Sequence, residues 1–220
     1  MVFWIVCAIG LILAYLLGSI PTGYWAGRLL RGIDIREHGS KSTGATNALR
    51  TLGPWPALVV LLVDVTKGAA AVVFIRWLFF WLFTQSTISA PAAIDLQSLE
   101  PWGVFAAGLA ALLGHGRSIW LRFTGGKSAA TGLGVLLAMS PAVGLGAALV
   151  FGTVLAISRI VSLSSILAAL AALALVLGLE QPLPYRMLVI AGGIYVIMRH
   201  VANIQRLLAG SEPRLGQKAQ

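Results

Sequence analysis

Residues 117–131, RSIWLRFTGGKSAAT, join a polar loop to an apolar segment. A glycine pair, Gly125 and Gly126, and the cation of Lys127 stand immediately before the apolar residues that follow Ser128. Glycine main-chain amides, a helix N-terminus and a mobile cation together form a suitable arrangement for binding phosphate. An ordinary interfacial loop, whose cations extend to the lipid headgroups, would have the same composition. The stretch predicts a polar loop that opens directly into a membrane helix, with phosphate binding as one of two interpretations.

The composition of the whole chain supports a membrane location for that helix. Of the 220 residues, 58% are hydrophobic and 10% are charged, whereas about a quarter of the residues in a typical soluble domain are charged. We therefore predict an all-α integral membrane protein. A helix needs about 20 apolar residues to cross the hydrocarbon layer. Candidate spans are residues 3–27, 55–83, 102–121, 161–179 and 184–201.

No second domain stands out in the sequence. No basic residue precedes the first apolar stretch and no small-residue cleavage site follows it, so we predict a retained membrane helix instead of a cleaved signal peptide. Cys7 is the only cysteine, which excludes a disulfide within the chain. We predict a single membrane domain over residues 1–220, with a polar C-terminal tail from about residue 210.

Residues 128–157 are too long for one ordinary span, and Pro141 interrupts them. Proline inside a helix removes a hydrogen bond and clashes with the preceding turn, so this region is either two short helices or one kinked helix. With seven segments and an external N-terminus, thirteen of the 16 Lys and Arg residues face the cytoplasm, as the positive-inside rule favours. The connection over residues 84–101 then lies outside, with Asp95 and Glu100 but no Lys or Arg. The thirteen cations are Arg28, Arg31, Arg36, Lys41, Arg50, Arg117, Arg122, Lys127, Arg159, Arg199, Arg206, Arg214 and Lys218.

The distribution of charge thus predicts seven transmembrane or membrane-embedded helices, with the N-terminus outside and the C-terminus in the cytoplasm. One of the seven, residues 128–140, rises only about 20 Å. Because this is short for the bilayer, we expect local thinning of the bilayer, a tilted helix, or a helix partly sunk into the membrane.

Several polar segments meet at the cytoplasmic side in this topology. The first, residues 39–50 (GSKSTGATNALR), combines glycines, hydroxyls and an arginine that can approach and bind an anion. A turn rich in glycine and serine before a capped helix is the alternative. The spacing of a Walker loop is absent. The candidate donors of this segment are Ser40, Thr46, Asn47 and Arg50.

Two further segments carry ionisable groups. Asp64 and Lys67 lie three residues apart in the second apolar segment, on one face of a helix, and form either a structural ion pair or part of a functional site. His200 and Asn203 share a helix face by the same spacing at the end of the last span. For His200, a hydrogen-bonding role and a role as catalytic base both stay open. Residues 158–162 add a weaker polar contribution.

Several common catalytic motifs are missing. The residues five positions after the histidines are Thr43, Trp120 and Gln205, so the His/Asp motif of acyl-CoA-dependent glycerolipid acyltransferases is absent. The sequence has no G-x-S-x-G nucleophile motif, and its seven carboxylates form no cluster with histidines that suits a catalytic metal. The net charge of +9 comes from loop cations and does not indicate nucleic-acid binding. Cations, amides and hydroxyls remain, which favours a site that holds phosphate.

In these motifs the chain resembles the bacterial acyl-phosphate:glycerol-3-phosphate acyltransferase family. The resemblance implies a seven-helix enzyme of the cell inner membrane. It implies transfer of a fatty acyl group from acyl phosphate to the 1-hydroxyl of glycerol 3-phosphate, giving lysophosphatidic acid and inorganic phosphate for phospholipid synthesis. The matching segments follow the family's order and cover nearly the whole chain: LLGSIPTGY (16–24), HGSKSTGATNALRTLG (38–53), DVTKG (64–68), GHGRSIWLRFTGGKSAAT (114–131), SRIVSLSSI (158–166) and RHVANIQRLLAG (199–210).

The loops and the resemblance together predict the site. The predicted catalytic residues are Ser40, Arg50, Lys127 and His200. The predicted substrate contacts are Gly39, Lys41, Thr46, Asn47, Gly125, Gly126, Ser128 and Asn203. Two positions depart from the family pattern: Lys41 replaces the second glycine of GSGN, and Ser128 replaces the last glycine of GGKG. Either change can alter the loop shape or the affinity for the acceptor, and Lys41 can add a phosphate contact.

Both substrates of this reaction carry phosphate, so the site has to hold two anions. We expect the loop 125–127 to hold one phosphate, that of the donor. The acceptor side is expected to consist of Ser40, Asn47, Arg50, His200 and Asn203. Direct transfer is favoured because an acyl phosphate is already activated, and a covalent acyl intermediate on Ser40 is the alternative. The expected partners are acyl phosphate, glycerol 3-phosphate and membrane lipids, with no cofactor, metal or nucleic acid, in a monomer. A membrane transporter of a phosphate-bearing solute and a structural membrane subunit are the competing functions.

Overall fold

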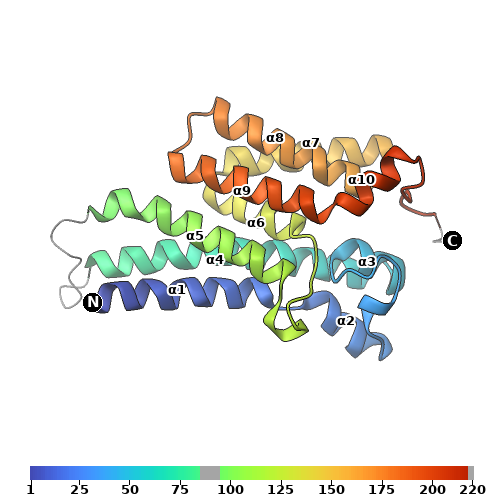
Figure 1. Cartoon of the computed structure of the whole chain (residues 1–220), viewed down its shortest axis with the longest axis horizontal. Helices are drawn as coiled ribbons and strands as arrows, with labels where there is room; N and C mark the ends of the chain where they lie inside the picture. The colour runs from blue at the N-terminus through green and yellow to red at the C-terminus, as the bar shows by residue number, and fades with distance from the viewer. Residues whose placement is uncertain (85–94, 218–220) are drawn as a thin grey trace.

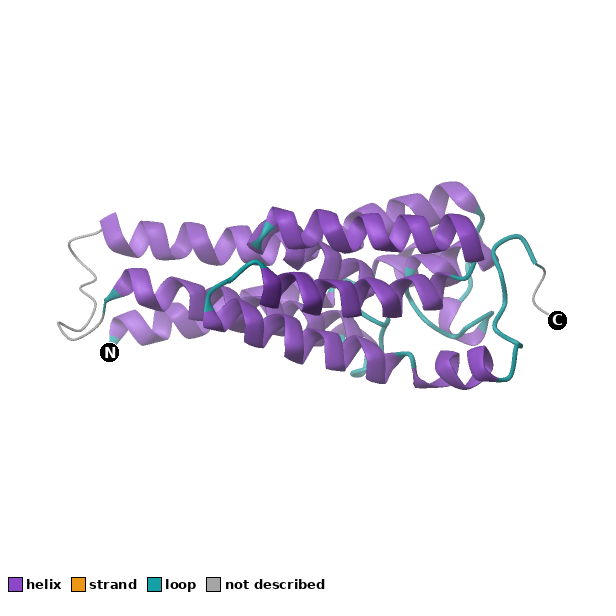
Figure 2. Cartoon of the chain, turned by 90° about the horizontal axis from the view of Figure 1, so that it is seen from above, coloured by secondary structure: helices purple, strands orange, loops and turns teal. Residues whose placement is uncertain are grey.

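The computed structural model describes residues 1–84 and 95–217, which form helices that run along one long axis (Figures 1 and 2). In these residues the only β pairing is an isolated bridge between Ser118 and Thr124. Lys218 and most of the predicted external connection, residues 85–94, lie outside the described residues. The elements are α1 Val2–Ser19, α2 Thr22–Arg31, η1 Ile35–Glu37, α3 Ala45–Thr51, α4 Pro54–Thr84, α5 Leu96–Gly116, η2 Ile119–Leu121, α6 Ala129–Met139, α7 Pro141–Ser158, α8 Val161–Gly178, α9 Leu183–Arg199 and α10 Val201–Leu208.

Four helical segments of the described chain are long and apolar enough to cross a membrane: Val2–Arg31, Pro54–Leu82, Pro141–Ser158 and Val161–Gly178. The helices α9 and α10, which meet at a bend of 60°, give a fifth if they count as one broken span. α6 is apolar but has only 11 residues. The all-helical membrane architecture predicted from the sequence is therefore present, whereas the count of seven helices and the orientation of the termini stay predictions.

The predicted first span, residues 3–27, is two helices, α1 and α2, which meet at Pro21. Proline has no amide hydrogen to donate to the preceding turn, so the helical hydrogen bonds stop here. The carbonyl oxygen of Ile20 at this break accepts a hydrogen bond of 2.9 Å from the ammonium of Lys67 in α4. A buried cation of a neighbouring helix thus donates a hydrogen bond to a carbonyl at the end of α1 that has no helical partner.

The third predicted span, residues 102–121, is also shifted. α5 begins at Leu96 and ends at Gly116, and the chain beyond it forms a loop with the short helix η2. The hydroxyl of Ser118 donates to the carbonyl oxygen of Ser19 at 2.6 Å, which ties the loop to the end of α1. This contact between distant segments draws the chain out of the helix although its residues are apolar.

Residues 128–157 form two helices, one of the two alternatives that the sequence left open. Ser140 between α6 and α7 is extended (φ −145°, ψ 97°), and Pro141 takes the first position of α7, where proline is favoured. α7 folds back against α6, since a Cβ on Gly144 would lie 2.6 Å from the main-chain nitrogen of Leu137. The proline therefore starts a new helix instead of kinking an existing one.

An arginine of α4 caps the C-terminal end of the short helix α6. Arg76 Nη1 donates to the Ala138 carbonyl at 2.7 Å, and Nη2 donates to the Met139 carbonyl at 3.2 Å. The same guanidinium contacts the Tyr185 hydroxyl of α9 at 2.7 Å and Glu100 of α5 at 3.1 Å. Carbonyls at a helix end have no partner within the helix, and the apolar membrane interior offers no water to replace it. Arg76 thus supplies the hydrogen bonds that the C-terminal carbonyls of α6 lack, so this helix can end after only 11 residues.

Replacement of Arg76 by alanine is expected to lower the melting temperature of the purified protein in detergent. It removes hydrogen bonds from a charged donor, each of which contributes about 1.5–3 kcal/mol. Arg76→Lys retains the charge but not the planar fork, so it should fall between alanine and the wild type. Thermal unfolding of the three proteins measures the effect, and equal melting temperatures would show that the carbonyls of α6 do not need this cap.

Glycines bring the helices around the predicted site into backbone contact. A Cβ on Gly18 of α1 would lie 2.2 Å from the Ala111 carbonyl oxygen of α5, and one on Gly134 of α6 would lie 1.9 Å from the Val65 carbonyl oxygen of α4. Small residues permit this close approach in membrane bundles, where close packing drives helix association. α1 therefore packs closely against α5, and α6 packs closely against α4.

Candidate active site

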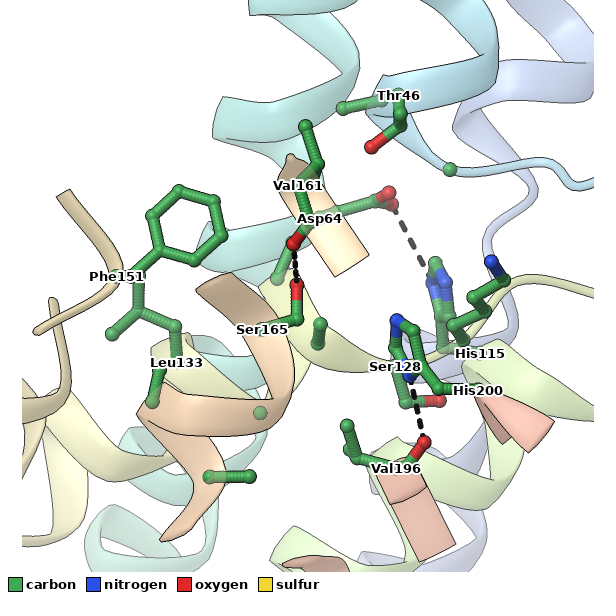
Figure 3. A pocket seen from close by; sticks show the side chains of 18 of the residues that line it. Thr46, Asp64, His115, Ser128, Leu133, Phe151, Val161, Ser165, Val196 and His200 are labelled. Atoms are coloured by element: carbon green, nitrogen blue, oxygen red, sulfur yellow. Dashed lines mark hydrogen bonds and ion pairs between the residues drawn. The ribbon is translucent and has the colours of Figure 1, made fainter. Parts of the chain in front are cut away.

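One cavity of about 420 Å³ collects the polar residues of segments that are far apart in the sequence. Figure 3 shows the apolar side chains of Leu133 and Phe151 on one side of it and His115 and His200 on the other. The ionisable and amide side chains that line the cavity are Asn47, Arg50, Asp64, His115, Lys127, His200, Asn203 and Glu212. The hydroxyl side chains that line it are Ser40, Ser42, Thr46, Ser128, Ser162 and Ser165. Arg50 and Lys127, the two cations predicted to hold phosphate, thus share one space.

Asn47 organises the loop that presents Ser40. Its side chain is buried, and its Oδ1 accepts a hydrogen bond of 2.8 Å from the Ser40 amide. Its Nδ2 donates to the carbonyl oxygens of Ile35, His38 and Ser42, at 2.9, 3.1 and 2.8 Å. These bonds engage both the oxygen and the nitrogen of the side-chain amide within the loop. The geometry therefore gives Asn47 a role in holding Ser40 at the cavity.

Gly39 and Lys41 flank Ser40 but do not line the cavity. Both have left-handed backbone conformations, with φ of +56° and +55°. A Cβ on Gly39 would lie 2.3 Å from Asn47 Oδ1, so only glycine fits there. Lys41 is exposed and occupies a left-handed conformation in which the family pattern has glycine. Their predicted contacts with substrate stay predictions.

Arg50 lies in α3, a short helix anchored by apolar residues. Ala48 and Leu52 pack in a buried cluster with Ala57 and Val60 of α4. Arg50 lines the cavity, and its side chain forms no hydrogen bond or ion pair with residues of the described chain. Its guanidinium is therefore available to an anion, and Thr46 on the same helix lines the cavity beside it.

A chain of hydrogen bonds holds Lys127. Its ammonium donates to Asn203 Oδ1 at 2.5 Å, and Asn203 Nδ2 donates to Glu212 Oε1 at 2.6 Å. Burial is the main reason that the pKa of Lys127 falls to about 8, although the Glu212 carboxylate opposes this and Arg50 is among the cations that add to it. Lys127 is therefore a weakly solvated cation, and its contact with a phosphate would be stronger than that of an exposed lysine.

Gly125 and Gly126 pack against His115 instead of facing the cavity. A Cβ on Gly126 would lie 2.0 Å from His115 Nε2, and the Gly126 amide donates to the His115 carbonyl oxygen at 3.1 Å. Arg199 Nη2 donates to the carbonyl oxygens of Gly125 and Gly126 at 3.2 and 3.0 Å. Close packing thus explains the glycine pair without a ligand, and its predicted contact with phosphate stays a prediction.

Ser128 follows Lys127 in a strained conformation. It is buried, its φ is +61°, and its hydroxyl donates to the Leu112 carbonyl oxygen of α5 at 2.8 Å. The family pattern has glycine here, and glycine adopts this φ without strain. The serine retains the left-handed backbone and adds a bond from the start of α6 to α5.

The two simplest replacements of Ser128 are expected to differ in stability. Ser128→Ala loses the hydroxyl bond and keeps the strain, whereas Ser128→Gly loses the same bond but relieves a backbone strain of about 1–2 kcal/mol. The glycine variant should therefore melt at a higher temperature than the alanine variant. Thermal unfolding in one detergent tests this, and an alanine variant that melts at the same or a higher temperature would contradict it.

His200 ends α9 and is buried at the cavity. Its Nδ1 lies 2.8 Å from the Val196 carbonyl oxygen. A carbonyl only accepts, so Nδ1 carries the hydrogen, and in the neutral ring Nε2 remains as an acceptor. The fixed tautomer fits both interpretations from the sequence, because Nε2 can orient a substrate hydroxyl or take its proton.

Two functional candidates escaped the sequence analysis. Glu212 lies in the predicted polar tail but is buried, and besides Asn203 it accepts hydrogen bonds from Ser162 and Arg206. His115 lies near the end of the predicted span 102–121 and was not singled out, although it packs against the glycine pair. The signal for Glu212 was its rarity, since a chain with 16 cations has only seven carboxylates.

Comparisons with known proteins identify relatives of this chain. Residues 8–210 match the profile of the family described as glycerol-3-phosphate acyltransferase. The chain is 75% identical over 219 residues to glycerol-3-phosphate acyltransferase 2 of Rhizobium johnstonii, covering all of both proteins. It is 54% identical to the glycerol-3-phosphate acyltransferase of Trichodesmium erythraeum, covering 99% of this chain and 96% of the relative.

Two solved structures have the same fold. Both are of PlsY (YgiH), described as an integral membrane glycerol 3-phosphate acyltransferase, and each is 34% identical to this chain. The glycerol 3-phosphate form has a TM-score of 0.79 and 96% coverage of both chains. The lysophosphatidic acid form has a TM-score of 0.77, with 96% of this chain and 95% of the other covered. With a matching profile, relatives of the same length and a shared fold, the chain belongs to the glycerol-3-phosphate acyltransferase family of integral membrane enzymes of lipid biosynthesis.

Proposed function

We propose that this protein transfers a fatty acyl group from an acyl phosphate to the 1-hydroxyl of glycerol 3-phosphate, giving lysophosphatidic acid and inorganic phosphate. The observation that carries the proposal is one cavity with two kinds of lining. Arg50 and Lys127 supply positive charge in it, and Leu133 and Phe151 supply apolar surface. Such a cavity suits two phosphate-bearing reactants of which one has an acyl chain. The glycerol 3-phosphate and lysophosphatidic acid forms of the structural relative support the same acceptor and product.

We place the protein in the cell inner membrane as a monomer with seven membrane-embedded helices, the N-terminus outside and the C-terminus in the cytoplasm. The first and last described residues lie at opposite ends of the long axis (Figure 1), as an odd number of passages requires. α2, α3 and α10 lie at the end of the long axis opposite the N-terminus. These helices carry Arg28, Arg31, Arg50 and Arg206, which the positive-inside rule assigns to the cytoplasm.

The reaction can proceed without a strong protein base. The 1-hydroxyl oxygen of glycerol 3-phosphate attacks the acyl carbonyl carbon, the bond from this carbon to the phosphate oxygen breaks, and the leaving phosphate takes the proton. Lys127 would hold the donor phosphate, while Arg50 and His200 would bind and orient the acceptor. Cations fixed in place reduce the repulsion between the two anions and position the reacting atoms, which is a large source of rate in bimolecular transfer.

A covalent intermediate on Ser40 is the alternative to direct transfer. In that mechanism the serine oxygen would first take the acyl group and release phosphate, and glycerol 3-phosphate would then attack the acyl-serine. Mass spectrometry of protein incubated with acyl phosphate alone distinguishes direct transfer from the acyl-serine mechanism. We expect no acyl adduct, and a trapped acyl-Ser40 that glycerol 3-phosphate discharges would overturn direct transfer.

The decisive assay uses purified protein in lipid vesicles with labelled glycerol 3-phosphate and either acyl phosphate or acyl-CoA as donor. We expect labelled lysophosphatidic acid and phosphate from acyl phosphate only. Product from acyl-CoA would refute the donor proposed here. Passage of label into the vesicles without product would instead identify a transporter. If neither product nor passage of label is detected, a structural subunit is the remaining function.

Arg50→Lys tests whether phosphate is bound by a planar fork. We expect KM for glycerol 3-phosphate to rise about tenfold with a smaller change in kcat, because lysine keeps the charge but loses bidentate geometry. Steady-state kinetics in detergent or vesicles measures both constants. A variant with wild-type KM would reduce Arg50 to a cation that sets the topology.

A further inference from the structure

Three ionisable side chains lie buried together behind the loop that carries Lys127. Asp64 and Lys67 of α4 and His115 of α5 are each less than a tenth exposed. Lys67 Nζ lies 2.8 Å from Asp64 Oδ1, and His115 Nδ1 lies 3.6 Å from the same oxygen. Figure 3 shows the contact between Asp64 and His115 beside the cavity. The mechanism proposed above uses none of these three groups.

The other edge of the His115 ring is in contact with the glycine loop. A Cβ on Gly126 would lie 2.0 Å from His115 Nε2, and one on Gly125 would lie 2.2 Å from the His115 carbonyl oxygen. The Gly126 amide donates to that carbonyl at 3.1 Å. No space remains between ring and loop, so a displacement of the imidazole displaces Gly126 and, with it, Lys127.

Asp64 in turn is held from the side of α1. The ammonium of Lys67 joins the Asp64 carboxylate to the Ile20 carbonyl oxygen at the break between α1 and α2. A buried ion pair is expensive to desolvate, and apolar residues of the same volume often stabilise a protein equally well. The cluster is therefore better explained as a device that fixes positions than as a source of stability.

We propose that Asp64 and His115 are positioning residues for the transfer reaction. The carboxylate holds the imidazole, and the imidazole holds the Gly125–Gly126 turn so that the Lys127 ammonium stands at the cavity. The proposal rests on the phosphate-binding role proposed above for Lys127. Neither residue has to touch the substrate in order to affect its binding.

The first experiment measures hydrogen exchange of the loop in the full-length protein, because exchange does not depend on activity. In His115→Ala the ring contact with Gly126 is lost, while the main-chain bond from Gly126 and the bonds from Arg199 remain. We expect exchange in peptides that cover residues 121–128 to rise about tenfold while peptides from α7 and α8 stay unchanged. Asp64→Asn should give a smaller rise. If the unpaired Lys67 prevents folding of Asp64→Asn, the double variant Asp64→Asn with Lys67→Gln removes both charges and retains a donor for Ile20.

The second experiment separates KM from kcat for acyl phosphate. We expect KM to rise and kcat/KM to fall about 100-fold in His115→Ala, since misplacement by about 1 Å is enough for such a loss. His115→Asn, whose amide nitrogen can occupy the place of Nδ1 beside Asp64, should recover part of it. The matched control is Glu100→Gln, which breaks an ion pair with Arg76 at the opposite end of α6. It should lower the melting temperature without changing KM or the exchange of residues 121–128.

Unchanged loop exchange and unchanged KM in His115→Ala would overturn the proposal, even if the variant melted earlier. A second outcome separates the two ideas. If the loop exchanges faster in the variants but the wild-type protein makes no lysophosphatidic acid, the positioning of Lys127 is supported and the proposed function is refuted. The two ideas therefore fail separately.

Discussion

Replacement of Lys127 by alanine is expected to lower kcat/KM for acyl phosphate by about 100- to 1000-fold, the loss found when one preorganised partner of a developing charge is removed. The ammonium is half-buried and held by Asn203, so it is in place before the substrate arrives. A buried cation is also screened less by water and salt than an exposed one. Initial rates with the purified variant in vesicles measure the effect, and near-normal turnover would remove Lys127 from the mechanism.

The pH dependence of the same step has a definite sign. Burial lowers the pKa of Lys127 to about 8, so the side chain is a cation below this pH and becomes neutral above it. We expect kcat/KM, which reports the ionisation of the free enzyme, to fall as the pH rises through about 8. Lys127→Arg is the matched control, because arginine stays charged over this range. Its profile should stay flat to higher pH, and an identical fall in both proteins would assign the ionisation to another group.

Replacement of Glu212 by alanine is expected to reduce both stability and activity. Its carboxylate joins Ser162 of α8 to Asn203 and Arg206 of α10. Loss of these bonds should lower the free energy of unfolding by about 3 kcal/mol. Asn203 would also lose the partner that turns its Oδ1 toward Lys127. Thermal unfolding and KM for acyl phosphate measure the two effects. Glu180→Gln, which changes an exposed carboxylate after α8, is the control and should alter neither.

The hydrogen bonds of Glu212 should also make the stability of the protein depend on pH in the acidic range. Burial raises the pKa of Glu212, but the hydrogen bonds from Asn203, Ser162 and Arg206 outweigh it and hold the pKa below its ordinary value of 4.5. A carboxylate of this kind stabilises the protein above its unfolded pKa and loses the contribution as the pH falls through the folded one. The wild type should therefore lose more stability than Glu212→Ala between about pH 6 and pH 3. Equal losses in the two proteins would contradict this.

The individual site residues show where inference from the sequence was sufficient and where it was not. Lys127 and Arg50 stood out because cations beside glycines and hydroxyls are informative within one short segment, and the structure brings both to one cavity. Asn47 was predicted to contact substrate, and this stays a prediction; that its side chain also forms hydrogen bonds within its own loop was not foreseen. Glu212 was treated as part of a polar tail because its partners lie in α8 and α10. A residue's type indicates which bonds it can form, but only the fold decides which groups are within reach.

The sequence by itself determined the membrane class, the main apolar spans and the position of the break at Pro141. Hydropathy and the missing amide hydrogen of proline act on neighbouring residues, so they can be read locally. Only the tertiary structure decided that α5 stops at Gly116 and that the glycine pair turns to His115. These outcomes depend on contacts between segments that are far apart in the chain, such as Ser118 with Ser19. The strength of such contacts depends on distance and burial, which no stretch of sequence contains.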